Sequence, residues 1–182
     1  SIISSCIFDE TTKPKKNVLD RFKNDKRKIK KIKIIKILLK KNNIVAGVDE
    51  VGRGCLAGPV CAAVVILNKN ISVKDIKDSK KIPFKKRFLL SEYIKKNSIY
   101  AVGYSSVDEI NKINILNASL LAMQRALEKI KIKPSIVYID GPFAPSNTNI
   151  KCKTIIRGDQ KIKCISAASI VAKVSRDILM IK

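Results

Sequence analysis

The sequence contains no histidine. That absence excludes Ser-His-Asp and Cys-His nucleophile systems, zinc sites built on imidazole, and histidine general bases. Any chemistry that this chain performs must therefore depend on carboxylates, lysines, cysteines or a metal ion that is held by oxygen ligands.

Cysteines are few, and none of the five forms a CxxC pair. A chain of 182 residues can build a core without disulfides, so we interpret these cysteines as reduced and mostly buried, in a cytoplasmic protein. No apolar run reaches the roughly 18 residues of a membrane-spanning helix. The N-terminus also lacks the apolar stretch of a signal peptide, so no membrane is expected. The chain does not begin with Met, which suggests a fragment of a longer product.

Acidic residues are scarce relative to basic ones. The chain has 38 Lys and Arg against 15 Asp and Glu, a net charge of +23 and an isoelectric point of about 10.0. Such a charge predicts a polyanionic partner, with nucleic acid the leading candidate. Lys and Ile are both over-used throughout the sequence, so part of this charge reflects composition alone.

Residues 1–41 form a basic N-terminal extension, with 14 basic and 4 acidic residues. Ile29, Ile32, Ile35 and Leu39 recur at helical spacing within it and predict an amphipathic helix. Such a helix could lie on a membrane or on RNA, or it could pack its Ile face on the domain and leave the lysines in water.

Patterns of strand and helix alternate along residues 42–182. This alternation predicts one α/β domain with a sheet covered by helices. The expected strands are residues 44–48, 59–67, 99–104, 135–140 and 154–156. The expected helices are residues 84–96, 106–130, which begins with a capping box, and 166–182.

Two adjacent acids, Asp49 and Glu50, interrupt the first apolar run where burial should be deepest. An unpaired buried carboxylate is costly and normally neutralises or finds a partner. The turn Gly52-Arg53-Gly54 follows at once and offers exposed N–H groups and a guanidinium. This arrangement favours a metal or phosphate site. A hairpin whose acids simply face water would have the same sequence pattern.

Asp140 repeats this pattern at the end of a later strand, and Asp177 lies on the last helix. Mg²⁺ and Mn²⁺ prefer carboxylates and water, and two such ions can activate water to hydrolyse a phosphodiester. The segment Asp78-Ser79-Lys80-Lys81 could hold a phosphate or could simply lead into a helix. The residues therefore favour metal-dependent phosphodiester hydrolysis.

Several motifs together resemble the signature of bacterial ribonuclease HII. The stretch Gly47-Val48-Asp49-Glu50-Val51-Gly52-Arg53-Gly54 is the most specific of them, and Arg53 favours this type over the sister type, ribonuclease HIII. The matching segments follow one another in family order over residues 47–60, 78–81, 114–123, 140–141 and 165–177.

The resemblance implies an RNase H-like fold with a central mixed β-sheet flanked by helices. It implies a monomeric endonuclease that cuts RNA in RNA–DNA hybrids and ribonucleotides embedded in duplex DNA, on their 5′ side, leaving 3′-hydroxyl and 5′-phosphate ends. The implied cofactors are two divalent ions, Mn²⁺ or Mg²⁺. The family's catalytic and metal-binding acids match Asp49, Glu50, Asp140 and Asp177, and its substrate-binding residues match Gly52, Arg53, Gly54, Ser79, Lys80 and Lys81.

The sequence departs from the family pattern at two points. Cys55 stands where the family usually has Pro, and the chain ends five residues after Asp177, without the family's tyrosine at the RNA–DNA junction. We therefore expect a member that is shortened at its C-terminus. The alternative function is a non-catalytic basic nucleic-acid-binding protein, which would not need four acids on a positive surface.

Overall fold

A computed structural model describes residues 44–55, 57–68 and 83–181 of this chain. The predicted extension over residues 1–41, with its amphipathic helix, lies outside the described residues. So do Ser79, Lys80 and Lys81.

A mixed sheet lies at the centre of the described part of the chain, as the sequence predicts. The opening hairpin is confirmed, because β1 and β2 are antiparallel neighbours; β3 extends this antiparallel half, while β4 and β5 are parallel to β1. The strand order across the sheet is β3-β2-β1-β4-β5. The strands are β1 (Val45–Val51), β2 (Val60–Ile66), β3 (Ile99–Ser105), β4 (Ile136–Asp140) and β5 (Lys151–Ile155).

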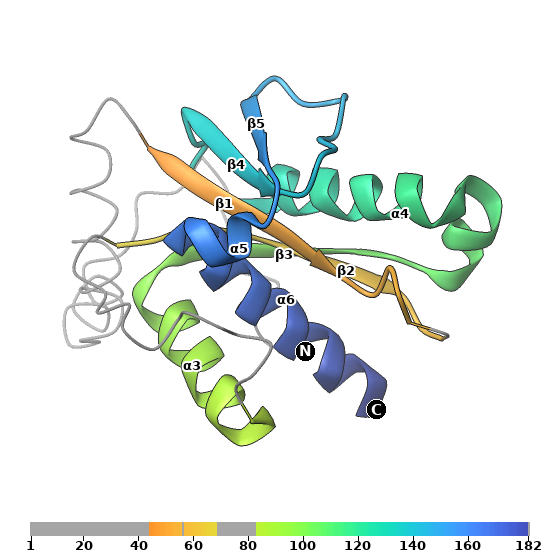
Figure 1. The fold of residues 1–182 in the computed structure, drawn as a ribbon, viewed down its shortest axis with the longest axis horizontal. Coiled ribbons are helices and arrows are strands. Elements are labelled where there is room, and N and C mark those ends of the chain that lie inside the picture. The colour runs from red at the N-terminus through yellow and green to blue at the C-terminus, as the bar shows by residue number, and fades with distance from the viewer. Residues whose placement is uncertain (1–43, 56, 69–82, 182) are drawn as a thin grey trace, which may run out of the picture.

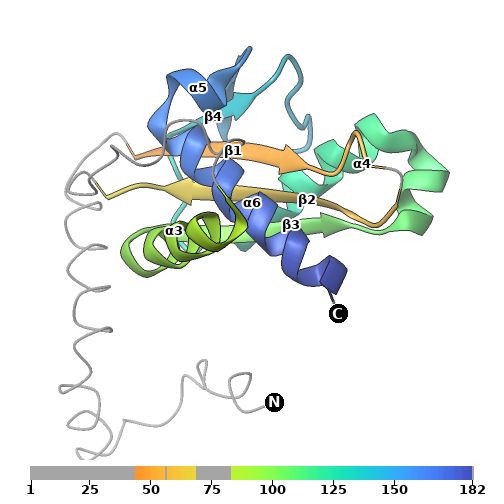
Figure 2. The same cartoon turned by 60° about the horizontal axis from the view of Figure 1, so that its bottom comes forward.

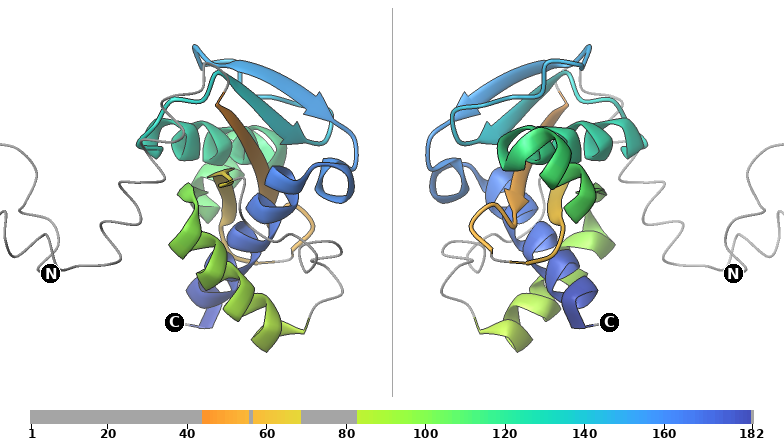
Figure 3. Two further views of the ribbon diagram at one scale, coloured as in Figure 1. Left: turned by 90° about the vertical axis from the view of Figure 1, so that its left-hand side faces the viewer. Right: turned by 90° about the vertical axis from the view of Figure 1, so that its right-hand side faces the viewer.

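Helices cover both faces of this sheet, so the described residues form three layers (Figure 1). Helix α4 (Val107–Lys129) lies on one face, while α3 (Phe84–Asn97) and α6 (Lys163–Ile181) lie on the other, which two side views show (Figure 3). The short α5 (Gly158–Lys161) precedes α6. None of the described helices is long and apolar enough to cross a bilayer.

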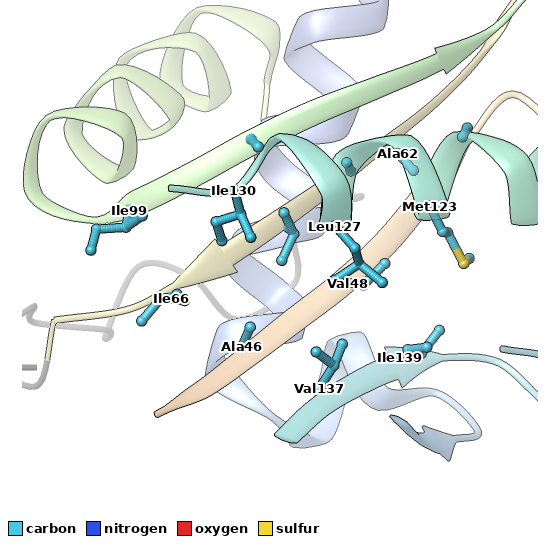
Figure 4. Close-up of a cluster of buried hydrophobic side chains, with 14 of the residues drawn as sticks. Ala46, Val48, Ala62, Ile66, Ile99, Met123, Leu127, Ile130, Val137 and Ile139 are labelled. Atoms are coloured by element: carbon cyan, nitrogen blue, oxygen red, sulfur yellow. The ribbon is translucent and has the colours of Figure 1, made fainter. Parts of the chain in front are cut away.

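Strand β2 is buried on both faces and explains how the two cores are divided. Its alternate residues Val60, Ala62, Val64 and Ile66 pack toward α4, whereas Cys61, Ala63 and Val65 pack toward α6. Val48 of β1 joins Met123 and Leu127 of α4 in the first core (Figure 4).

Small side chains allow α6 to lie close against β1. A Cβ atom added at Gly47 would stand 2.2 Å from the backbone carbon of Cys164, so only glycine fits there. Ala167, Ala168 and Ala172 of α6 are fully buried in the second core. This close approach places α6 across β1, as the view onto that face shows (Figure 2).

Helix α4 begins with the predicted capping box between Ser106 and Glu109. It is not continuous, because Asn114 has a φ of 65° and a ψ of 166° and its side-chain oxygen accepts from the N–H of Asn117. Ile113 immediately precedes this break and is 37% exposed.

Helix α3 forms where predicted, but its apolar residues are only partly buried. Ile94 is fully buried, whereas Phe84, Phe88 and Leu89 remain exposed.

Candidate active site

One pocket lies at the carboxyl ends of β1 and β4, with a volume of about 290 Å³. It brings together three of the four predicted acids, although Asp49 and Asp140 are far apart in the sequence. Its lining residues are Asp49, Glu50, Val51, Arg87, Asp140, Ser169 and Lys173.

The strand register explains why Asp49 and Asp140 meet. Strands β1 and β4 are parallel neighbours, and Val48 pairs with Ile139, so the acids follow this pair at the same end of the sheet. Alternation points Asp49 toward α6, where its carboxylate has a hydrogen bond to the Ser169 side chain. Glu50 points to the other face by alternation, but it lines the same pocket because β1 ends one residue later.

The carboxylate of Asp140 is oriented by the start of α5. Its Oδ1 accepts hydrogen bonds from the N–H of Gly158 at 2.6 Å and of Asp159 at 3.4 Å. Donors at the start of a helix orient and favour a negative side chain. The turn after β5 therefore holds one wall of the pocket in place.

Burial, together with the crowding of acids, makes ionisation within this pocket unfavourable. The pKa of Asp49 is raised well above its ordinary value, first by burial and then by the charge of Glu50, with a smaller effect of Asp140. Burial also raises the pKa of Glu50, and the hydrogen bond from Arg53 opposes this increase. A divalent cation bound among these carboxylates would favour their ionised forms, and carboxylates with raised pKa values in a pocket are typical of functional sites.

Asp177 lies beside this pocket and does not line it. Its carboxylate is paired with Lys173 Nζ at 2.6 Å and Arg87 Nη2 at 3.3 Å, and both cations do line the pocket. The predicted convergence therefore holds for three acids, while the fourth is paired with two cations that line the pocket.

The donor set of the pocket suits a hard divalent cation. Three carboxylates supply oxygen ligands only, and Glu50 Oε2 is buried with no hydrogen-bond partner among the described residues. In this conformation, no three acidic or cysteine side chains within the described ranges already surround one ion position. Chemistry and burial fit such a cation, which would require the side chains to close on it.

The predicted Gly52-Arg53-Gly54 turn connects β1 to β2 at the mouth of the pocket. Gly52 has a φ of +115°, and its carbonyl accepts from the N–H of Cys55 at 3.3 Å, which closes the turn. Arg53 is exposed and its Nη1 donates to Glu50 Oε1 at 3.3 Å. A Cβ at Gly54 would meet no atom within 4 Å, so its backbone is open to a ligand.

Reasoning from the sequence missed three residues that line the pocket: Arg87, Ser169 and Lys173. A signal existed for two of them, since Ser169, Lys173 and Asp177 recur every four residues and share one face of α6. No sequence pattern placed Arg87 of α3 beside this face.

A family model for ribonuclease HII matches residues 46–182, which include all four predicted acids. The chain belongs to the ribonuclease HII family. Ribonuclease HII of Pelagibacter ubique (strain HTCC1062) is 62% identical over 139 residues, which are 76% of this chain and 75% of that protein. Ribonuclease HII of Borreliella burgdorferi (strain ATCC 35210 / DSM 4680 / CIP 102532 / B31) is 51% identical over 140 residues, 76% of this chain and 77% of that protein.

A solved structure supports the same conclusion for the fold. The ribonuclease H2 of Pyrococcus horikoshii OT3 superposes with a TM-score of 0.64 at 32% identity, covering 75% of this chain and 73% of that one. The predicted RNase H-like fold is therefore confirmed, and the chain is a ribonuclease H enzyme of the HII family.

Proposed function

We propose that this chain is a metal-dependent endonuclease that hydrolyses the RNA strand of RNA–DNA hybrids. We further propose that it cuts on the 5′ side of ribonucleotides embedded in duplex DNA and leaves 3′-hydroxyl and 5′-phosphate ends. The observation that carries the proposal is the shared pocket of Asp49, Glu50 and Asp140, whose lining also includes the basic side chains of Arg87 and Lys173.

In this proposal, the three pocket carboxylates together with Asp177 would hold two divalent cations, Mg²⁺ or Mn²⁺. Bound there, such ions would supply Lewis-acid stabilisation of the phosphodiester and a water nucleophile at neutral pH. The hydrogen bonds from Ser169 to Asp49 and from the start of α5 to Asp140 keep the two carboxylates oriented. The crowded acids themselves would exclude a bare phosphate from the pocket.

Lys173 and Arg87 have a second role in the proposal. Both line the pocket while they pair with Asp177, so their charges lie between the acids and an incoming nucleic-acid strand. Cations at that position attract and orient phosphate groups. They would hold the strand at the pocket, beside the Asp177 carboxylate that would help to hold the cations.

Recognition of the ribonucleotide is assigned to Gly52, Arg53 and Gly54. The open space over Gly54 allows the backbone to approach a sugar, and a 2′-hydroxyl distinguishes RNA from DNA at such a contact. The matching Ser79, Lys80 and Lys81 would contact phosphates of the same duplex.

The remaining expectations about the chain belong to this proposal as well. We assign catalysis to residues 42–182 and treat residues 1–41 as a basic extension. We propose a monomer that acts in the cytoplasm. In support, the four described cysteines are free thiols, and burial raises the pKa of Cys61 to about 12 and of Cys164 to about 11.

The test is Asp49→Asn, which keeps the side-chain shape and removes one negative charge from the pocket. Cleavage of a duplex with a single ribonucleotide, measured with Mg²⁺ or Mn²⁺, should fall by roughly 10³-fold, while binding of the duplex survives. Glu128→Gln removes the same charge from an exposed position on α4 and should leave cleavage unchanged.

Two results would contradict the proposal. The first is a parent chain that shows no cleavage dependent on a divalent cation, which is the behaviour of a non-catalytic binding protein. The second is equal cleavage by the Asp49→Asn and Glu128→Gln variants.

A further inference from the structure

Arg176 precedes Asp177 on α6 and is 5% exposed. A buried guanidinium is costly unless its donors are satisfied, and it is usually paired with a carboxylate. In the part of the chain that the structure describes, no acidic side chain pairs with it. Its partners are backbone carbonyls, with Nη2 donating to Ala57 O at 2.6 Å and Nε donating to Pro59 O at 3.0 Å.

Both carbonyls belong to the connection between β1 and β2, whose described residues 52–55 and 57–59 we call the glycine loop. Two glycines of this loop also lie close to the guanidinium. A Cβ atom at Gly52 would stand 3.0 Å from Arg176 Nε, and one at Gly58 would stand 3.3 Å from Nη2. Both glycines have positive φ, +115° and +87°, so the backbone here has the form that lets it pass this close.

The geometry explains why an arginine occupies this position. Two carbonyls that are two residues apart are reached by the planar fork of one guanidinium, whereas the single ammonium of a lysine is a point donor. The fork joins the loop to the same turn of α6 that carries Asp177. The end of α6 therefore connects the fourth acid with the loop that carries Arg53.

We infer that Arg176 is a positioning residue that fixes the glycine loop on α6. It thereby sets where Arg53 and Gly54 meet the ribonucleotide. The second part of this inference rests on the proposed function, whereas the fixing of the loop does not.

A spin label on Cys55 tests the fixing of the loop directly. Cys55 is exposed within the loop, while Cys61 and Cys164 are buried, so a background with Cys6→Ser and Cys152→Ser leaves one reactive thiol. Arg176→Met removes both donors at similar side-chain length. The label should become several-fold more mobile in Arg176→Met, and Arg176→Lys should give an intermediate mobility.

Arg125→Met is the matched control. Arg125 also donates to a backbone carbonyl, Tyr104 O at 2.8 Å, but it lies on α4, on the opposite face of the sheet from Arg176, and pairs with Glu109. This variant should lose stability without changing the mobility of the label. If Arg176→Met does not fold, Arg176→Lys decides the same comparison.

Kinetics of unlabelled variants test the consequence for the substrate. With a duplex that contains one ribonucleotide, Arg176→Met should raise KM about tenfold and change kcat less, since a loosened loop weakens binding. Arg125→Met should keep the parent's KM under conditions where both variants are folded.

Each outcome decides one part of the inference. Equal label mobility in the parent and Arg176→Met would overturn the fixing of the loop. Greater mobility with an unchanged KM would overturn its importance for the substrate. A parent chain that does not cleave would refute the proposed function, yet the label would still show whether Arg176 fixes the loop.

Discussion

Two groups of carboxylates in this molecule have opposite environments. On α4, Glu109 meets the guanidinium of Arg125 through both of its oxygens, at 2.6 and 2.8 Å, and its pKa is lowered to about 2, mainly by that pairing. At the end of β1, the pKa values of Asp49 and Glu50 are raised by burial, and Asp140 adds to the repulsion.

The difference teaches which acids serve the fold and which serve a ligand. Glu109 also accepts from the N–H of Ser106 and from the Ser105 hydroxyl, so its hydrogen-bonding capacity is used within the chain. Glu50 has one buried oxygen without a partner in the described residues. A site whose charges are unbalanced in the protein alone is balanced by what it binds.

The strongest test of this contrast is the response to a divalent cation. At a Mn²⁺ concentration about 100 times its dissociation constant, binding should stabilise the parent by about 2.7 kcal/mol and raise Tm by roughly 8 °C. Asp49→Asn should lose most of this shift, whereas Glu109→Gln should keep it. Scanning calorimetry with and without EDTA measures both. Equal Tm shifts in Asp49→Asn and Glu109→Gln would contradict the distinction between the two groups of carboxylates.

A second test examines the metal-free protein. Because the pKa of Asp49 is raised in the folded state, its ionisation lowers stability as the pH rises above the unfolded value of about 3.9. Asp49→Asn should therefore stabilise the protein at pH 7 in EDTA by about 1 kcal/mol, although it abolishes cleavage. Urea denaturation at pH 7 and pH 4 measures the effect, which should shrink at the lower pH. If Asp49→Asn instead lowered the free energy of unfolding at pH 7, the charge of the Asp49 carboxylate would already be compensated within the protein.

The smallest expected effect concerns Glu109, where the sign is reversed. Its folded pKa of about 2 lies below the unfolded value of about 4.3, so ionised Glu109 stabilises the fold above the unfolded value, and this contribution declines toward pH 2. Glu109→Gln should lower the free energy of unfolding at pH 7, and the difference from the parent should diminish as the pH falls from 5 to 3. Glu92→Gln, which removes an exposed pair with Lys95, should have little effect at either pH. A difference for Glu109→Gln that does not depend on pH would contradict this assignment.

The sequence by itself determined the order of the elements and the identity of the principal acids. Apolar runs marked β1 and β2, and Ser106 with Glu109 marked the start of α4, because these signals depend on residues that are close in the chain. Asp49 and Asp140 could be assigned to strand ends by the same local patterns. The family motifs then indicated how these acids are used.

Only the tertiary structure decided how the pocket is completed. Arg87 reaches it because α3 packs beside α6, and Asp177 is held beside it by Lys173 and Arg87. The exposure of Ile113 likewise follows from a backbone break at Asn114 that apolar periodicity does not reveal. Periodicity reports which face of a helix is apolar, but side-chain partners depend on which elements pack together, and that is set by the whole core.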